Sequence, residues 1–207
     1  LKVAEEVKKA LPAIRKSLPK DIELVVAVDN SRFVKASLNE VLNSLIFAFI
    51  LVVFVTLVFL KSKTATIIAS LSIPVSIIGT FAAMQVLGFS TNVLTLLGLV
   101  LAIGLVVDDA IVVLENIFRR QELGEDKLKA AFKGSSEIAF PVIATTVALI
   151  AVFIPLSTLT GSVGRQFKEF ALTVASSVAI SGIVALTLIP ALCSKLLQHK
   201  KSDEEKG

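Results

Sequence analysis

The stretch GLVVDDAIVVLEN, residues 104–116, places two adjacent aspartates, Asp108 and Asp109, inside an apolar run, and Glu115 follows shortly after them. An aspartate at the centre of a membrane-spanning helix costs roughly 2.5–3.5 kcal/mol, so two of them cost about 5–7 kcal/mol. The leucines, valines and isoleucines around the pair offset most of that cost. We therefore expect this segment to insert into a membrane as a helix and to turn its acids away from lipid.

The rest of the chain is also apolar enough for a membrane. Of its 207 residues, 55% are hydrophobic, and the mean hydropathy is +0.85. One crossing takes about 20 apolar residues, which makes a very apolar soluble protein the weaker interpretation. The uncharged segment 64–107 is long enough for two crossings, with LGFSTN (87–92) as the break. The sequence predicts an all-α polytopic membrane bundle with five spans near 41–60, 66–87, 92–118, 138–158 and 167–193.

Lysine and arginine alternate between the loops. They occur after the first span, after the third span and in the C-terminal tail; the turn at 87–92 has none, and the connection before the fifth span has only Arg165. The positive-inside rule then places the loops near 62 and 119–136 and the tail in the cytoplasm. The N-terminal segment and the turns at 87–92 and 158–165 are expected outside.

Three regions follow from this division. The sequence of residues 1–36 predicts a helix followed by a strand at 22–28. Because one helix and one strand are too small to fold alone, we expect this segment to be an α/β remnant of a larger domain. Residues 37–197 form the transmembrane region, with an amphipathic cytoplasmic helix near 124–136. Residues 198–207 are expected to be a charged cytoplasmic tail.

Several kinds of site are disfavoured. The single cysteine, Cys193, and the single histidine, His199, exclude a disulfide framework and argue against a Cys/His metal site. The net charge of +4 is spread over the loops, so no nucleic-acid partner is expected.

The spacing of the acids suggests proton chemistry. Adjacent helical residues point about 100° apart, so Asp108 and Asp109 diverge; Asp108 shares a face with Glu115, and Asp109 shares one with Asn116. We expect at least one aspartate to exchange a proton near neutral pH. A static buried ion pair is the alternative, but we expect no buried lysine or arginine in this chain to complete it. An intramembrane aspartyl protease needs aspartates that face each other, so we do not expect an enzyme.

Five residues are candidate supports for the pair. Gly104 lies one turn before Asp108 and leaves room for a neighbouring helix or water. Asn116 shares a face with Asp109. Glu115 is expected mainly to pair with Arg119, four positions later. Thr145 and Thr146 are candidates for a hydrophilic path, although such residues also serve in helix packing.

These segments resemble a known family. TNVLTLLGLVLAIGLVVDDAIVVLENIFR (91–119) closely resembles the fourth transmembrane helix of resistance–nodulation–division (RND) multidrug efflux permeases of the acriflavine-resistance type. The segments 37–60, 64–90, 141–156 and 167–197 resemble the second, third, fifth and sixth helices.

The resemblance implies a proton-driven drug antiporter of the bacterial inner membrane, with Asp108 and Asp109 as the proton relay and the proton gradient in place of a cofactor. Family members have twelve helices in two repeated halves and form homotrimers. They work with a periplasmic adaptor and an outer-membrane channel on amphiphilic small molecules. The resemblance also implies that the acids pair with a lysine of the second half, which this chain lacks, and that residues 1–36 end a periplasmic porter subdomain. A related proton-coupled exporter of lipids, or a helper of protein translocation, is the alternative.

Overall fold

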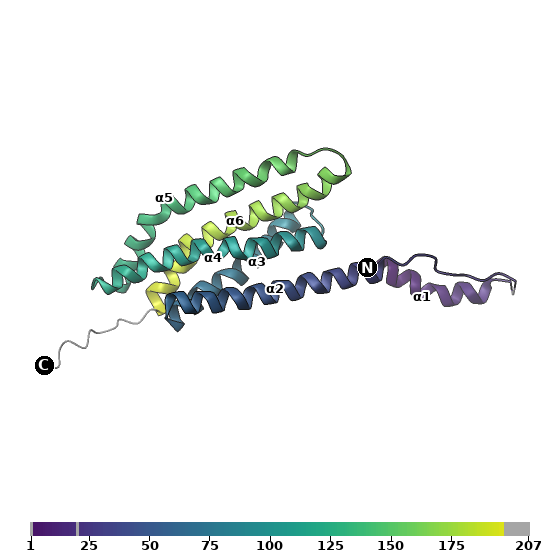
Figure 1. Ribbon diagram of the computed structural model, residues 1–207, viewed down its shortest axis with the longest axis horizontal. Coiled ribbons are helices and arrows are strands. Elements are labelled where there is room, and N and C mark those ends of the chain that lie inside the picture. The colour runs from purple at the N-terminus through teal and green to yellow at the C-terminus, as the bar shows by residue number, and fades with distance from the viewer. Residues whose placement is uncertain (1, 20, 197–207) are drawn as a thin grey trace.

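The computed structural model describes residues 2–19 and 21–196, which form a helical bundle with one outlying helix (Figure 1). Five helical segments in the described part are long and apolar enough to cross a membrane, which confirms the predicted number. The elements in chain order are α1 (Lys2–Ser17), α2 (Ser31–Leu60), α3 (Lys63–Val86), α4 (Val93–Glu122), α5 (Lys127–Phe153), the 3₁₀ helix η1 (Ile154–Thr158) and α6 (Gly161–Leu196).

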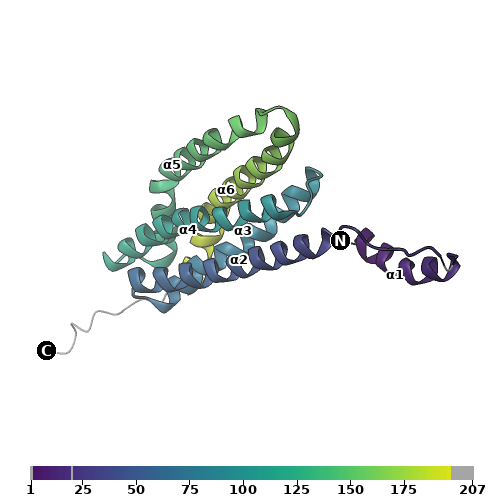
Figure 2. The same cartoon turned by 45° about the vertical axis from the view of Figure 1, so that its right-hand side comes forward.

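The central helix of the bundle is α4. It packs against α2, α3, α5 and α6, and Figure 2 shows it enclosed among them. Its side chains Leu99, Val113, Leu114 and Ile117 are completely buried. Because α4 is the most enclosed element together with α6, polar groups on its inner face are shielded both from lipid and from bulk water.

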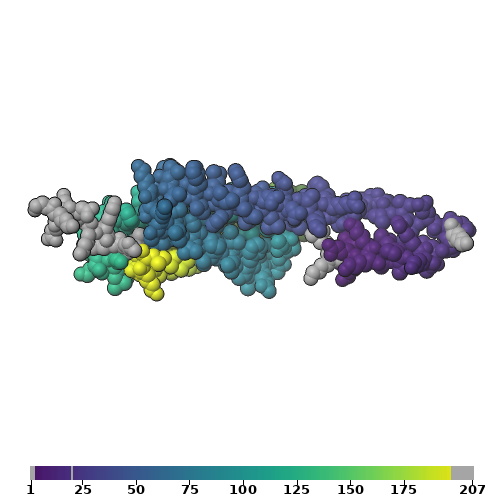
Figure 3. All heavy atoms as spheres, turned by 90° about the horizontal axis from the view of Figure 1, so that it is seen from below, coloured from purple at the N-terminus to yellow at the C-terminus, as the bar shows by residue number. Residues whose placement is uncertain are grey.

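The outer helices leave much apolar surface uncovered. Only 11% of the most apolar window of α2 is buried, and 6% of the corresponding window of α5. Figure 3 shows α2 running along the outside of the bundle, with α1 beyond its N-terminal end. Apolar exposure on this scale suits a lipid solvent or further protein, rather than water.

Local side chains set the helix starts. Asn92 accepts a hydrogen bond from the Thr95 amide, and the Thr95 hydroxyl accepts one from the Asn92 amide, which makes a capping box for α4. Ser62 and Asp126 cap α3 and α5 in the same general way, each accepting from a backbone amide in the first turn. Gly124 follows α4 with a φ of +86°, a left-handed conformation that glycine adopts without strain.

Two sequence predictions differ from the structure. Residues 22–29 are neither strand nor helix, so the expected strand of the α/β remnant does not form. A strand is stabilised by pairing, and the described residues offer it no partner strand. The expected separate helix near 124–136 is the start of α5, which continues past it without a break.

The helical turns around 127–138 rise steeply from the end of α4 before α5 aligns with α6 (Figure 1). Pro141 lies inside α5 and lacks the amide that would complete the helical ladder there, a common cause of a bend. The expected charged tail at 198–207 lies outside the described residues.

Candidate functional site around two aspartates

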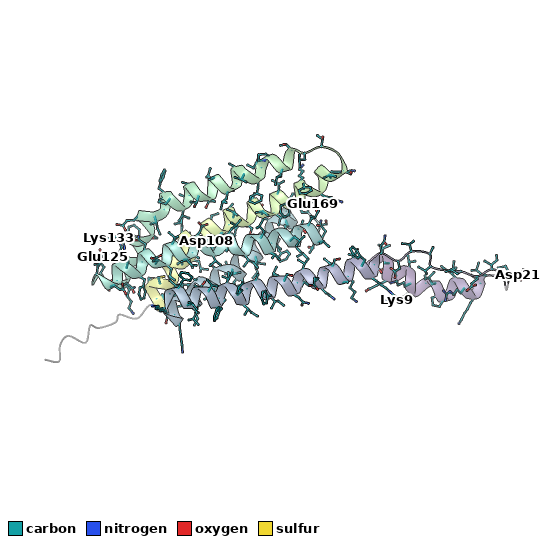
Figure 4. The ribbon with its side chains drawn as sticks, viewed as in Figure 1. Lys9, Asp21, Asp108, Glu125, Lys133 and Glu169 are labelled. Carbon is teal, nitrogen blue, oxygen red and sulfur yellow. The ribbon has the colours of Figure 1, made fainter. Side chains whose placement is uncertain are left out.

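The two aspartates occupy different environments on α4. Asp109 is 8% exposed and belongs to the buried arc that includes Val106, Ala110 and Val113. Asp108 is exposed on the adjacent face, midway along the bundle (Figure 4). The 100° step between neighbouring helical residues makes the two side chains diverge, as the sequence predicts. The described helices enclose only Asp109, which differs from the expectation that both acids turn inward.

Neither carboxylate has a partner within residues 2–19 and 21–196. No hydrogen bond or ion pair in this part of the chain reaches Asp108 or Asp109, although Asp109 is one of the buried residues of α4. A carboxylate held in a low-dielectric environment is stabilised by a cation or by protonation. The arrangement therefore suits a group that takes up and releases a proton.

A hydroxyl from α6 lies one helical turn away from Asp109. Ser181 donates a hydrogen bond of 3.0 Å to the carbonyl oxygen of Val106, and both groups are buried. This contact fixes α6 against α4 beside the buried aspartate. Sequence reasoning did not single out Ser181; its only signal was a small polar residue beside Gly182 in an apolar helix.

The candidate supports do not gather around the pair. Gly104 is exposed, and a Cβ placed on it would meet no described atom within 4 Å, so no described helix uses the space that it leaves. Thr145 is exposed and its hydroxyl donates to the carbonyl of Val142 at 2.9 Å. Thr146 packs against Gly182, and its buried hydroxyl has no partner in the described residues.

Glu115 and Asn116 also differ from expectation. The predicted ion pair between Glu115 and Arg119 is not formed, because Arg119 donates to the amide oxygen of Asn116 at 2.8 Å. Asn116 in turn donates to the carbonyl of Gly134 at 2.8 Å and to Glu137 at 3.1 Å. Asn116 thus links α4 to α5 instead of supporting Asp109.

A charged cluster at the same end of α4 was missed by sequence reasoning. Arg120 donates through Nε to Glu137 at 2.9 Å and through Nη2 to the other oxygen of that carboxylate. It also donates to Glu125, which lies 3.7 Å from Lys133 (Figure 4). Arg120 and Glu137 are seventeen positions apart, so the pair does not follow the i,i+3 or i,i+4 spacing by which a sequence predicts ion pairs.

A second polar cluster joins α4 and α6 at the opposite end of the bundle. Glu169 accepts hydrogen bonds from Asn92 at 2.8 Å and from Ser90 at 3.1 Å. A groove of about 440 Å³ beside it is lined by these residues, Arg165 and apolar residues of α2 and α4. In residues 2–19 and 21–196 no three His, Cys, Asp or Glu side chains form a group that could hold a metal ion.

Comparison with known proteins points in one direction. A model of the AcrB/AcrD/AcrF family matches residues 1–207. Multidrug resistance protein MdtC of Yersinia pseudotuberculosis (serotype O:1b, strain IP 31758) is 46% identical over 203 residues, which cover 98% of this chain and 20% of that protein. MdtC of Yersinia pestis bv. Antiqua (strain Angola) matches to the same extent. The chain spans about a fifth of the length of the curated relatives it matches.

Proposed function

This chain belongs to the AcrB/AcrD/AcrF family, among the resistance–nodulation–division permeases, and from that premise we propose that it contributes the proton-relay helices of a proton-driven multidrug efflux transporter. The observation that carries the proposal is Asp109, a buried carboxylate on the central helix with no cationic partner in the described residues. Buried intramembrane acids on a protein-facing surface commonly serve ion or proton pathways.

The two aspartates have complementary roles in this proposal. Asp108, which is exposed on α4, receives protons from a water-accessible path, and Asp109 holds a charge in the shielded interior. When Asp109 is ionised it attracts a cation from another part of the transporter; when it is protonated that attraction is lost. Because each state favours a different position of α4, proton uptake shifts a conformational equilibrium.

The energy available is sufficient for such a shift. One elementary charge that crosses a potential of about 100 mV is worth roughly 2.3 kcal/mol. A bias of roughly 1.4 kcal/mol changes an equilibrium constant about tenfold. One proton per cycle is therefore enough to change the relative populations of two transporter states substantially.

The wider setting follows from family membership. We propose that the transporter lies in the bacterial inner membrane, with residues 1–36 in the periplasm as the end of a porter subdomain. It works as a homotrimer with a periplasmic adaptor and an outer-membrane channel, and exports amphiphilic molecules. The relatives named multidrug resistance proteins support the substrate class.

The proposal is tested by Asp108→Asn and Asp109→Asn in the full-length transporter. Each change keeps the shape of the side chain and removes its ability to ionise, so we expect proton-coupled efflux to be abolished while the amount of protein in the membrane stays the same. Glu122→Gln, at an exposed position on the same helix, is the matched control. Drug accumulation in cells and drug-dependent proton flux in vesicles are the measurements. Normal efflux by Asp109→Asn would refute the relay.

A further inference from the structure

The start of α5 approaches α4 unusually closely. A Cβ on Gly134 would lie 2.9 Å from Cγ1 and 3.0 Å from Cα of Ile117, a separation that real side chains do not tolerate. Ala130 and Ala131, one turn earlier on α5, are also buried. Small residues therefore bring the two helix backbones together at this point, as they do at other tight contacts between membrane helices.

Charge-assisted hydrogen bonds connect the helices beside this contact. Glu137 receives two bonds from Arg120 and a third from Asn116. Asn116 also donates to the carbonyl oxygen of Gly134. A guanidinium that holds both oxygens of one carboxylate fixes orientation as well as distance. We call Asn116, Arg120 and Glu137 the α4–α5 clasp.

The clasp is the main point at which α5 is anchored to the central helix. The buried residues of α5 are Ala130, Ala131, Gly134 and Val142, three of which lie at the clasp. The remainder of α5 runs beside α6 (Figure 1). In that part Thr146 packs against Gly182. The side chain of Arg120 is 18% exposed and that of Glu137 is 44% exposed, so the specificity of the pair rests on its two-point geometry and not on burial.

Two residues of the clasp, Asn116 and Arg120, lie on the same helix as Asp109. Asn116 follows Asp109 by seven residues, about two helical turns, and so lies on nearly the same face. A continuous helix transmits a displacement along its axis with little loss. We propose that the α4–α5 clasp is a positioning site that makes α5 follow the movement of α4 when Asp109 changes its charge. This inference rests on the proposed relay function.

Spin labels in the full-length transporter test this directly. With native cysteines replaced, one pair of labels at Leu123 and Phe140 reports the separation of α4 and α5, and a second pair at Phe54 and Phe140 reports that of α2 and α5. All three positions are exposed or end a helix. Asp109→Asn stands for the protonated relay. We expect it to change the second distance and to leave the first unchanged.

Disrupting the clasp should uncouple the position of α5 from the movement of α4. In Glu137→Ala the Leu123–Phe140 distances should broaden, and the response of the second pair to Asp109→Asn should disappear. When Glu137→Ala is introduced alone and Asp109 is kept, kcat for efflux should fall about tenfold with KM unchanged. The reason is that the variant affects the conformational step and not drug binding. Arg120→Lys keeps the charge but not the two-point bond, and should give an intermediate loss. Glu122→Ala, which removes an exposed acid near the clasp, should behave as the parent protein.

The outcomes distinguish the two proposals. If Asp109→Asn changes the Leu123–Phe140 distance in the intact clasp, or if a stably inserted Glu137→Ala protein keeps the coupled response, the clasp inference is wrong while the relay stands. If Asp109→Asn moves neither pair and efflux is normal, the relay and the clasp both fail. Loss of protein alone, with full kcat per remaining molecule, also overturns the clasp as a positioning site.

Discussion

At Gly134 the contact between two helices depends on a missing side chain. Gly134→Ala would force its Cβ against the backbone of Ile117, where nothing flexible can move aside. Overpacking of this kind costs about 1–3 kcal/mol, so we expect a lower unfolding temperature in detergent. Gly104→Ala is the control, because its Cβ meets no described atom within 4 Å. Equal unfolding temperatures for the two variants would contradict the close contact.

The residues around the aspartate pair show which contacts can be predicted from the sequence and which cannot. Helical periodicity predicts that the side chains of Asp108 and Asp109 diverge, but it does not predict that Asp109 is the buried one and Asp108 the exposed one. The partners of Asn116 do not follow from it, because Gly134 and Glu137 approach only after the chain reverses between α4 and α5. Contacts across a turn depend on the turn geometry, which the side-chain pattern of one helix does not contain.

The boundaries of the helices show which signals the sequence carries. The breaks after Leu60 and Val86 fall where apolar segments end, as predicted. The helices nevertheless extend beyond the apolar segments: α2 begins at Ser31, and α5 begins at Lys127. Hydropathy reports where lipid is the solvent, whereas a helix ends where its backbone hydrogen bonds end. The cap residue Asp126 marks the start of α5 more closely than hydropathy does, because the predicted apolar span begins only near 138.

Lys8 of the short helix α1 binds the start of α2 through an ion pair with Asp29 and a hydrogen bond to Ser31. Lys8 lies 2.6 Å from Asp29, and this bond, with a smaller contribution from Ser31, lowers the pKa of Asp29 to about 2. Because the folded pKa is below the ordinary value of about 3.9, the stabilisation is present above that value and is lost as the pH falls through about 2. We therefore expect the Lys8–Asp29 ion pair to persist at neutral pH and to be lost in acid.

Replacing Lys8 tests whether this ion pair lowers the pKa of Asp29. Lys8→Ala should raise the pKa of Asp29 towards its ordinary value, and an NMR titration of the Asp29 carboxyl carbon measures this. Lys9→Ala is the matched control, since Lys9 is exposed and has no ion pair in the described residues (Figure 4). A pKa that stays near 2 in Lys8→Ala would show that another group holds the carboxylate ionised.

For the molecule as a whole, the distribution of loops is consistent with a membrane orientation. The α2–α3 and α4–α5 connections lie at one end of the bundle, and the α3–α4 and η1–α6 connections lie at the other (Figure 1). The basic residues Lys61, Lys63, Arg119 and Arg120 belong to the first end. The connections that carry these basic residues thus lie at the same end of the bundle. The positive-inside rule predicts that this end faces the cytoplasm.

Cysteine labelling in spheroplasts tests this orientation in the full-length transporter. With native cysteines, including Cys193, replaced, a membrane-impermeant thiol reagent should label Thr91→Cys and Thr160→Cys from outside, because both exposed positions lie at the end whose connections carry fewer basic residues. Lys61→Cys and Leu123→Cys should be labelled only after the membrane is opened. Each pair joins two different connections, so a missing or additional crossing would place its members on opposite sides. Labelling of all four sites with the sides exchanged would instead keep the five spans and reverse their direction, which would put residues 1–36 in the cytoplasm, away from any periplasmic domain.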